Sequence, residues 1–492
     1  MAMTLLPRFF VLESGGRYLS LTENQSSASV PSGFLKFDEE QIWSPRVKFE
    51  VERAKSVGVQ EMVHIRSCYN NKYWEVLPAA ANSTRVISAS GEKPEEDRSK
   101  ESCTLFKIHS ALTSNTAVRL QFVQNGMDAG RLLPNSVYNV TIHGGMTVSD
   151  EFTNNGLSKE FNVTNWETLV ILPKEVSFKS EELDGNYLCS RILDRRYPYQ
   201  RFESGLDVGD PLVAKELFPT PNGNYRIKDM HFGKFWRLGG NWIWADAEED
   251  SSNNNDTLFS IVKISDTVMG LRNLGNNRFC GAVTKEGKTD CLNADYPTIS
   301  RQTRLMIEER VLHREISDIK YRLSDSRIYQ DEIQEVAHAF ANNNSPTDND
   351  TITLNYKITE SRTSHWTNSV STSVGVAVSF EVSIIPIIAK GEVEVTTEFS
   401  YSHEWGVSKT TEITKEVSYV VTVPPFKTIK VTLMATKAAC DVPFSYTQTD
   451  LLTTGERVLI TKDDGVYTGI NSYNFNFSSQ DVTKDAQGRV FF

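Results

Sequence analysis

Several features that would assign this 492-residue chain to a familiar class are scarce. It has only 6 cysteines and no CxxC pair, which argues against a disulfide-stapled scaffold and against the usual zinc-finger spacing. We therefore predict buried thiols. We also expect no metal and no cofactor. The cysteines are Cys68, Cys103, Cys189, Cys280, Cys291 and Cys440.

Long apolar runs are also missing. No segment approaches the roughly 20 consecutive apolar residues of a transmembrane helix, so any entry into a membrane must use β-strands. The first residues lack a basic stretch followed by a sustained apolar one, because Arg8 and Glu13 interrupt the run. We therefore expect synthesis without a signal peptide, and a cytoplasmic or nucleocytoplasmic location for the soluble form.

Basic clusters and catalytic motifs are absent as well. The formal net charge is −11 and no Lys/Arg cluster occurs, which argues against a nucleic-acid partner. The 8 histidines are scattered, and no HExxH, GxSxG or P-loop motif is present. Glu392 and Glu394 could serve general acid/base chemistry, but a polar channel lining explains them better. We expect no enzyme.

A short repeated phrase dominates the first 300 residues or so. An apolar β-rich run is followed by a turn with Gly or Asn and then by an aromatic residue or Leu, at a period of about 50 residues. Each copy predicts a hairpin whose turn needs positive φ and whose large residue returns to a core. Three hairpins close a β-trefoil, so we predict two trefoils, over 1–153 and 160–298; a six-bladed or sandwich arrangement is the alternative. The turn phrases lie at 15–19, 70–74, 125–133, 184–188, 233–236 and 276–280.

These phrases resemble the tandem agglutinin domains of the plant amaranthin family. The resemblance implies binding of the Gal–GalNAc disaccharide of O-glycans, without metal, in a site shared between subunits. It implies sugar contact by Asn71, Tyr73 and Trp74. Tyr73 and Trp74 also occupy the position at which the repeat places a core aromatic, so a structural role stays open for both.

A second aromatic group lies in GKFWRLGGNWIWADA. Its three indoles, Trp236, Trp242 and Trp244, exceed what one hairpin can bury, so at least one is expected to be exposed to a ligand or partner. We take Trp236 and Trp242 as further sugar-contacting candidates, with the same structural alternative.

The character of the sequence changes after residue 303, and we expect a third domain over 303–492. Within it, Ile333, Val336, Ala337 and Phe340 fall at helical spacing behind a possible cap at Ser326. This spacing predicts a packing helix over 327–342.

The most informative segment runs from 370 to 401. Apolar and small polar residues alternate for about 15 positions, which is longer than an ordinary globular strand. We predict an amphipathic hairpin that inserts into a membrane, with its tip at Ile385–Ile388, whose proline marks the turn. A soluble sandwich with one buried face is the alternative. The inserting residues are Val374, Val376, Val378, Phe380, Val382, Ile384, Ile385, Pro386, Ile387, Ile388, Val393 and Val395.

The opposite face of this hairpin is polar and acidic. It is predicted to line the lumen of a β-barrel through Glu381, Lys390, Glu392, Glu394 and Glu398. A lone hairpin in lipid leaves unpaired backbone groups along its edges, so closure requires many copies. We therefore expect a homo-oligomeric ring in a target membrane.

The surroundings of the hairpin resemble the aerolysin-type pore-forming module. The phrases at 403–406, 423–426 and 440–446 recur in that order, with Trp366 and Trp405 beside the hairpin. We expect these two tryptophans in a core rather than in a membrane girdle. The whole chain resembles plant proteins that join amaranthin-like and aerolysin-like parts, such as the Hessian-fly-responsive proteins of cereals. An all-β, glycan-binding, pore-forming defence protein is the expectation; a multivalent lectin whose third domain only oligomerises it is the alternative.

Overall fold

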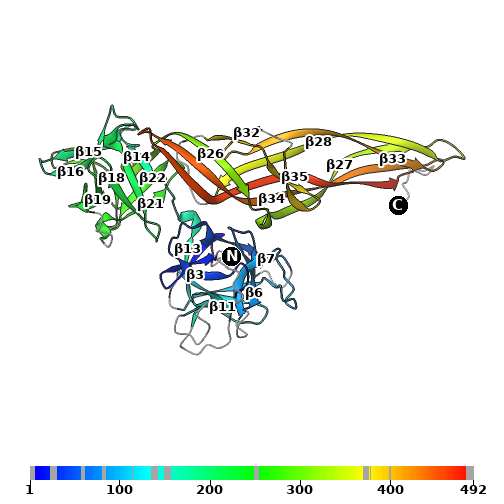
Figure 1. Cartoon of the computed structure of the whole chain (residues 1–492), viewed down its shortest axis with the longest axis horizontal. Helices are drawn as coiled ribbons and strands as arrows, with labels where there is room; N and C mark the ends of the chain where they lie inside the picture. The colour runs from blue at the N-terminus through cyan, green and yellow to red at the C-terminus, as the bar shows by residue number, and fades with distance from the viewer. Residues whose placement is uncertain are drawn as a thin grey trace. The chain divides into compact units, whose positions relative to one another are not determined.

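The alternating patterns of the sequence fold into strands throughout (Figure 1). The computed structural model describes residues 6–22, 30–56, 61–79, 85–112, 114, 116–133, 142–148, 157–248, 254–369, 376, 378–397 and 401–483. Over these residues the regular elements are β-strands and single-turn 3-10 helices, with no α-helix. Two compact units result: 1–314 with 369–377 and 448–460, and 315–368 with 378–447 and 461–492.

The N-terminal β-trefoil forms one antiparallel sheet system, in which β4 pairs with both β1 and β5. A core rich in Phe and Leu fills it. Its strands are β1 (Phe9–Ser14), β2 (Arg17–Leu21), β3 (Leu35–Glu39), β4 (Phe49–Arg53), β5 (Val63–Ser67), β6 (Tyr73–Pro78), β7 (Arg85–Gly91), β8 (Phe106–Ser110), β9 (Ala117–Phe122), β10 (Ala129–Leu132), β11 (Met146–Val148), β12 (Leu157–Ser158) and β13 (Phe161–Asn165).

The second β-trefoil repeats this plan, and β25 closes it by pairing with β14 and β22. Its strands are β14 (Glu175–Ser180), β15 (Tyr187–Leu193), β16 (Tyr197–Glu203), β17 (Lys215–Pro219), β18 (Tyr225–Asp229), β19 (Lys234–Gly239), β20 (Trp242–Ala247), β21 (Phe259–Lys263), β22 (Val268–Asn273), β23 (Arg278–Lys285), β24 (Lys288–Tyr296) and β25 (Arg304–Glu309). The 3-10 turns are η1 (Pro45–Val47), η3 (Trp166–Thr168), η4 (Pro211–Val213), η5 (Asn255–Thr257), η6 (Arg301–Thr303) and η7 (Leu323–Asp325).

The six repeated phrases are confirmed as turns with positive φ. Each contains a Gly, Asn or Asp in the left-handed region of backbone conformation, where residues with a larger or branched side chain are disfavoured. The residues with positive φ are Gly15, Gly16, Asn71, Gly126, Asp184, Gly185, Gly233 and Asn277.

The strand after each turn places one particular residue in the core. This residue is the second of two adjacent residues of the strand, as Leu19 follows Tyr18 and Trp74 follows Tyr73. In every copy it is at most 1% exposed. A position that is buried in all six copies is set by packing, whatever the residue that occupies it. The six residues are Leu19, Trp74, Leu132, Leu188, Trp236 and Cys280.

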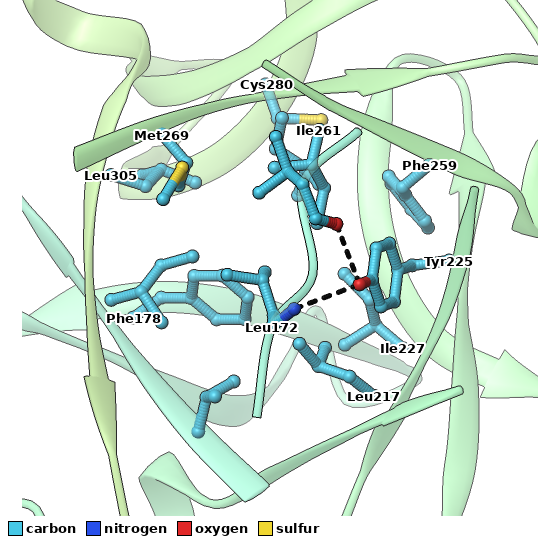
Figure 2. Close-up of a cluster of buried hydrophobic side chains, with 14 of the residues drawn as sticks. Leu172, Phe178, Leu217, Tyr225, Ile227, Phe259, Ile261, Met269, Cys280 and Leu305 are labelled. Carbon is cyan, nitrogen blue, oxygen red and sulfur yellow. Dashed lines mark hydrogen bonds between the residues drawn. The ribbon is translucent and has the colours of Figure 1, made fainter. Parts of the chain in front are cut away.

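The core of the second trefoil contains the hydroxyl group of Tyr225, which is hydrogen-bonded to the backbone (Figure 2). The hydroxyl of Tyr225 donates to the carbonyl of Val170 at 2.9 Å and accepts from the N–H of Leu172 at 3.0 Å, among Leu, Ile and Phe side chains. Burial raises the pKa of Tyr225 well above its usual value. The ring thereby fixes the entering segment at 170–172 onto the core.

The second unit is built on a six-stranded sheet whose longest members, β27, β28, β34 and β35, can be followed in Figure 1. The order is β26, β34, β35, β28, β33, and β27 also pairs with β34. A small core, which includes Tyr356, Val423 and Leu433, lies between these strands. The strands are β26 (Val311–Tyr321), β27 (Arg327–Asn342), β28 (Asp350–Asn368), β33 (Lys409–Val423), β34 (Thr428–Leu452) and β35 (Arg457–Asp481).

The helix predicted over 327–342 is wrong, because this segment is strand β27. The register against β34 shifts twice, between Tyr329 and Glu332 and between Glu335 and Ala337. Each β-bulge inserts unpaired residues and changes the face to which the following side chains point. The apolar residues therefore lose their period of two and acquire a spacing that imitates a helix.

The cysteines fit the predicted pattern. All six lie in described segments and form no disulfide, and all except Cys68 are buried. Burial raises the pKa of Cys440 to about 12 and that of Cys291 to about 11, which keeps both as thiols.

Candidate functional site

The predicted hairpin is a two-stranded ribbon that is separate from the six-stranded sheet. Strand β29 (Ser379–Val382) pairs with β32 (Tyr401–Glu404), and β30 (Ile385–Ala389) pairs with β31 (Glu392–Thr396). Over the described residues, none of these four strands pairs with the six-stranded sheet. No backbone ladder between described strands therefore joins the ribbon to that sheet.

The tip of the ribbon lies at Lys390 and Gly391, and the predicted tip at Ile385–Ile388 is wrong. Lys390 and Gly391 have φ of 51° and 86°, the left-handed region that a two-residue hairpin turn requires. Pro386 instead lies inside β30 opposite Val395. A proline is tolerated there because an edge strand has N–H positions that need no partner.

The alternation predicted for the outgoing arm is present. Val378, Phe380 and Val382 are buried, whereas Ser379, Glu381 and Ser383 are exposed. Of the other predicted inserting residues of this arm, Ile385, Pro386 and Ile388 are buried, and Val376, Ile384 and Ile387 are partly buried. On the return arm, Val393 is partly buried and Val395 is exposed. The apolar face of the outgoing arm thus lies largely against protein in this form.

The predicted lumen residues lie at the surface. Glu381, Lys390, Glu392 and Glu394 are exposed. Val374 and Glu398 lie outside the described residues.

Two side chains of β35 form hydrogen bonds with backbone groups of β30. The Asn471 amide donates from Nδ2 to the carbonyl of Ile388 and accepts at Oδ1 from the N–H of Ile388, both at 2.9 Å. The Tyr467 hydroxyl donates to the carbonyl of Pro386 at 2.9 Å. We call Asn471 and Tyr467 the clasp. It satisfies buried main-chain groups that a ladder would otherwise serve.

An aromatic cluster underlies β29 and β32. Trp366 is fully buried, and its Nε1 donates to the Tyr321 hydroxyl at 2.9 Å. Its ring lies 5.7 Å from that of Phe380 and 4.9 Å from that of Tyr467. Trp405 is partly buried and packs 4.9 Å from the ring of Tyr446. The expectation of a core position is confirmed for Trp366.

His403 is the titratable member of this cluster. It is 6% exposed, and its ring lies 4.2 Å from the Trp366 ring. Among the described atoms, its Nε2 has no hydrogen-bond partner. Burial, aided by the charge of Lys409, lowers the pKa of His403 to about 4, so the imidazole is neutral at pH 7.

A cavity of about 20 Å³ borders this histidine, enough for roughly one water molecule. Strands β28, β30, β32, β33 and β35 line it, and its cationic side chains are Arg362 and Lys409. Arg362 is ion-paired with Glu360 at 3.0 Å.

Sequence reasoning found the hairpin but missed His403 and Asn471. His403 was readable in part, because it continues the apolar face of the return arm at 393, 395 and 401. Nothing in the sequence marks Asn471, since its role depends on which main chain lies opposite it.

The predicted sugar-contacting residues of the first trefoil are buried. Trp74 is 0% exposed and packs edge-on against Phe49 at 5.1 Å, so the expectation that it contacts sugar is corrected: it fills the core. Tyr73 is buried and donates from its hydroxyl to Glu52 at 2.9 Å. Asn71 is buried and accepts from Arg66.

Two of the three indoles of the second trefoil, Trp236 and Trp242, are also buried. Trp236 is 0% exposed in the core, which corrects its assignment as a sugar contact. Trp242 is buried, and its Nε1 donates to Glu286 at 3.2 Å. Trp244 keeps a partly exposed position, stacked on Tyr197 at 4.3 Å. The expectation that at least one indole remains accessible thus falls on Trp244.

The described residues contain no group of three or more His, Cys, Asp or Glu side chains placed to hold a metal ion. They also contain no helix long and apolar enough to cross a membrane.

Comparison with known families accounts for both parts of the chain. The profile of the Agglutinin domain matches residues 4–132 and 171–308, which together exceed half of the chain. The chain belongs to the agglutinin domain family. The profile of the aerolysin toxin matches residues 300–451, so an aerolysin-like domain follows the two agglutinin domains. The predicted fusion is confirmed.

Among curated proteins, none matches the sequence. Solved structures show distant similarity. A lamprey immune protein is 13% identical, covering 64% of this chain and 91% of its own, with a TM-score of 0.30. An aerolysin-like protein of Bombina maxima is 13% identical over 34% of this agglutinin-family chain and 98% of its own, with a TM-score of 0.24. The BEL β-trefoil is 12% identical over 30% and 99%, with a TM-score of 0.24.

Proposed function

We propose that this agglutinin-family protein binds glycans on a target membrane, oligomerises there, and inserts the ribbon 378–404 into a shared transmembrane β-barrel. The observation that carries the proposal is the clasp on Ile388 and Pro386. A strand held by side chains, rather than by a backbone ladder, is suited to dissociate as a unit.

The dimensions of the ribbon support insertion. The outgoing arm, 378–389, has 12 residues, which at about 3.3 Å each reach about 40 Å. A transmembrane β-strand tilted by about 45° needs about 9–11 residues, so the arm is long enough to cross the hydrocarbon core. Once released, the face that carries Val378, Phe380 and Val382 must be buried again, and lipid would serve.

The edges of the ribbon support assembly from several copies. A single ribbon in lipid would leave two rows of unpaired N–H and C=O groups, each costing several kcal/mol. Copies of the same chain can supply the missing partners by closing a barrel. We propose a homo-oligomer for this reason.

The two agglutinin domains would direct the protein to its membrane. The resemblance to the amaranthin family favours Gal/GalNAc-containing glycans as ligands. Because the predicted contacts in the first trefoil are buried, we assign the binding to the domains rather than to individual side chains.

Dye release tests the proposal against its main alternative, a multivalent lectin with an oligomerising third domain. Vesicles carrying a GalNAc-terminated glycolipid and plain phosphatidylcholine vesicles would be loaded with a self-quenched dye. Leakage from the glycolipid vesicles, inhibited by free GalNAc, supports the pore. Agglutination of these vesicles without leakage, at any pH tested, supports the lectin and contradicts the pore.

A further inference from the structure

His403 combines three features that set it apart from the other residues of the ribbon. Its ring packs against both Trp366, at 4.2 Å, and Phe380, at 6.1 Å, and its Nε2 has no hydrogen-bond partner among the described atoms. It also lies on the strand, β32, that must move if the ribbon is to leave.

The charged groups around His403 oppose a further positive charge. Strand β33 presents Lys409 and strand β28 presents Arg362, and both line the cavity beside the imidazole. The nearest carboxylate of β28, Glu360, already pairs with Arg362 at 3.0 Å and with Lys415 at 3.1 Å.

The carboxylates that the described residues of the other elements bring to this cluster are exposed or already hydrogen-bonded. The buried one, Asp464 on β35, accepts from the Tyr446 hydroxyl at 3.2 Å, and burial raises the pKa of its carboxyl. Glu404 on the same strand and Glu381 on β29 both point to solvent. His365 on β28 is partly exposed and lies 3.4 Å from Ser408. From β35 and β26 the cluster receives Tyr467 and Tyr321, whose pKa values burial raises, so both stay neutral.

We propose that protonation of His403 releases the ribbon, so that mild acid is the trigger for insertion; this inference rests on the pore function proposed above. An imidazolium packed against Trp366 and Phe380 would be buried beside Lys409 without a counter-ion, whereas in the released ribbon water can solvate it.

The direction of the pH effect follows from proton binding. The pKa of docked His403 is about 4, against 6.5 for an ordinary histidine, so the docked ribbon binds fewer protons than the released one. Docking is therefore fully stable above about pH 6.5 and weakens as the pH falls toward 4. Between pH 7 and pH 5.5 the release equilibrium should rise about eightfold.

Hydrogen exchange on the full-length protein in solution, corrected for the intrinsic pH dependence, measures release without a membrane. Protection of peptides from 378–404 should fall about eightfold between pH 7 and pH 5.5. Protection of β23 and β24 in the second trefoil should not change. His403→Phe keeps a ring in the cluster and should abolish the pH dependence. His338→Phe, at an exposed histidine of the same unit, should leave it as in the wild type.

A wild-type ribbon whose protection stays flat from pH 7 to pH 4.5 overturns the proposal, even if the His403→Phe variant does not fold. So does a fall in protection that persists unchanged in folded His403→Phe. Dye release at each pH separates the two proposals. Hydrogen exchange that responds to acid, without leakage at any pH, supports the pH switch and contradicts the pore. Leakage without a pH dependence of the exchange supports the pore and contradicts the switch.

Discussion

Asn471 makes with Ile388 the two hydrogen bonds that a neighbouring strand would make, donating to its carbonyl and accepting from its N–H at 2.9 Å each. One side chain thus takes the place of a backbone ladder.

Asn471→Leu should loosen the ribbon. The leucine has a similar volume but leaves the N–H and carbonyl of Ile388 buried without partners, at a cost of about 1–3 kcal/mol for each group. We expect faster hydrogen exchange in 378–397 and faster dye release from glycolipid vesicles. The exposed Asn476→Leu is the matched control and should behave as the wild type. Unchanged exchange in Asn471→Leu would remove the clasp from the account.

The tip and the segment 327–342 show where prediction from sequence reaches its limit. Alternation identified the outgoing arm because burial on one face imposes a period of two. It misplaced the turn, since Pro386 was given more weight than Lys390–Gly391, whose positive φ defines the bend. In β27, bulges moved Ile333, Val336 and Phe340 to exposed positions, and no local signal distinguishes that pattern from a helix.

The sugar-contacting candidates show a different limit. The sequence placed Trp74 and Trp236 correctly at the large-residue position of the repeat. Whether that position faces a core or a ligand depends on how three hairpins close together, which is decided by contacts distant in sequence. The structure shows that the position is buried in every copy.

Trp74→Ala should therefore act on stability rather than on binding alone. Removing this indole from the core leaves a large cavity beside Phe49 and should cost about 3–5 kcal/mol of unfolding free energy. Thermal unfolding measures the loss, and retention on GalNAc beads below the melting temperature measures binding. Tyr73→Phe, which removes only the hydroxyl, is the milder control. A Trp74→Ala variant of full stability that no longer binds the beads would contradict the assignment to the core.

A buried ion pair supports the second trefoil. Lys215 and Asp229 are both fully buried, with Nζ and Oδ2 at 2.9 Å, and Ser190 also donates to Asp229. Burial lowers the pKa of Lys215, and the charge of Asp229 opposes that shift. Lys215→Met should cost about 3–5 kcal/mol, because it leaves an uncompensated carboxylate. Denaturant unfolding followed by tryptophan fluorescence tests this.

The double variant Lys215→Met/Asp229→Leu provides the comparison. It removes both charges, so it should recover most of the loss. If the double variant is less stable than Lys215→Met alone, the carboxylate is not the source of the destabilisation.

The exposed acidic residues of the ribbon predict cation selectivity for the proposed pore. Glu381, Glu392 and Glu394 are exposed on the ribbon, against one cation, Lys390. In a ring these side chains would form acidic belts that favour cations. Glu392→Gln combined with Glu394→Gln should shift the reversal potential of planar-bilayer currents under a KCl gradient toward zero. Glu412→Gln, at an exposed residue of β33, should not. An anion-selective wild-type channel would contradict the assignment of this face.

The central claim is that the ribbon leaves its docked position and crosses lipid with one face wet and the other apolar. Site-directed labelling tests it most directly: an environment-sensitive fluorophore is placed, one position at a time, in Ser379→Cys, Phe380→Cys, Glu381→Cys and Val382→Cys. On glycolipid vesicles, a quencher dissolved in the lipid should quench the labels at 380 and 382. A water-soluble quencher should quench the labels at 379 and 381. Four labels that respond alike, or that keep their solution spectra on protein bound to vesicles, would contradict the account.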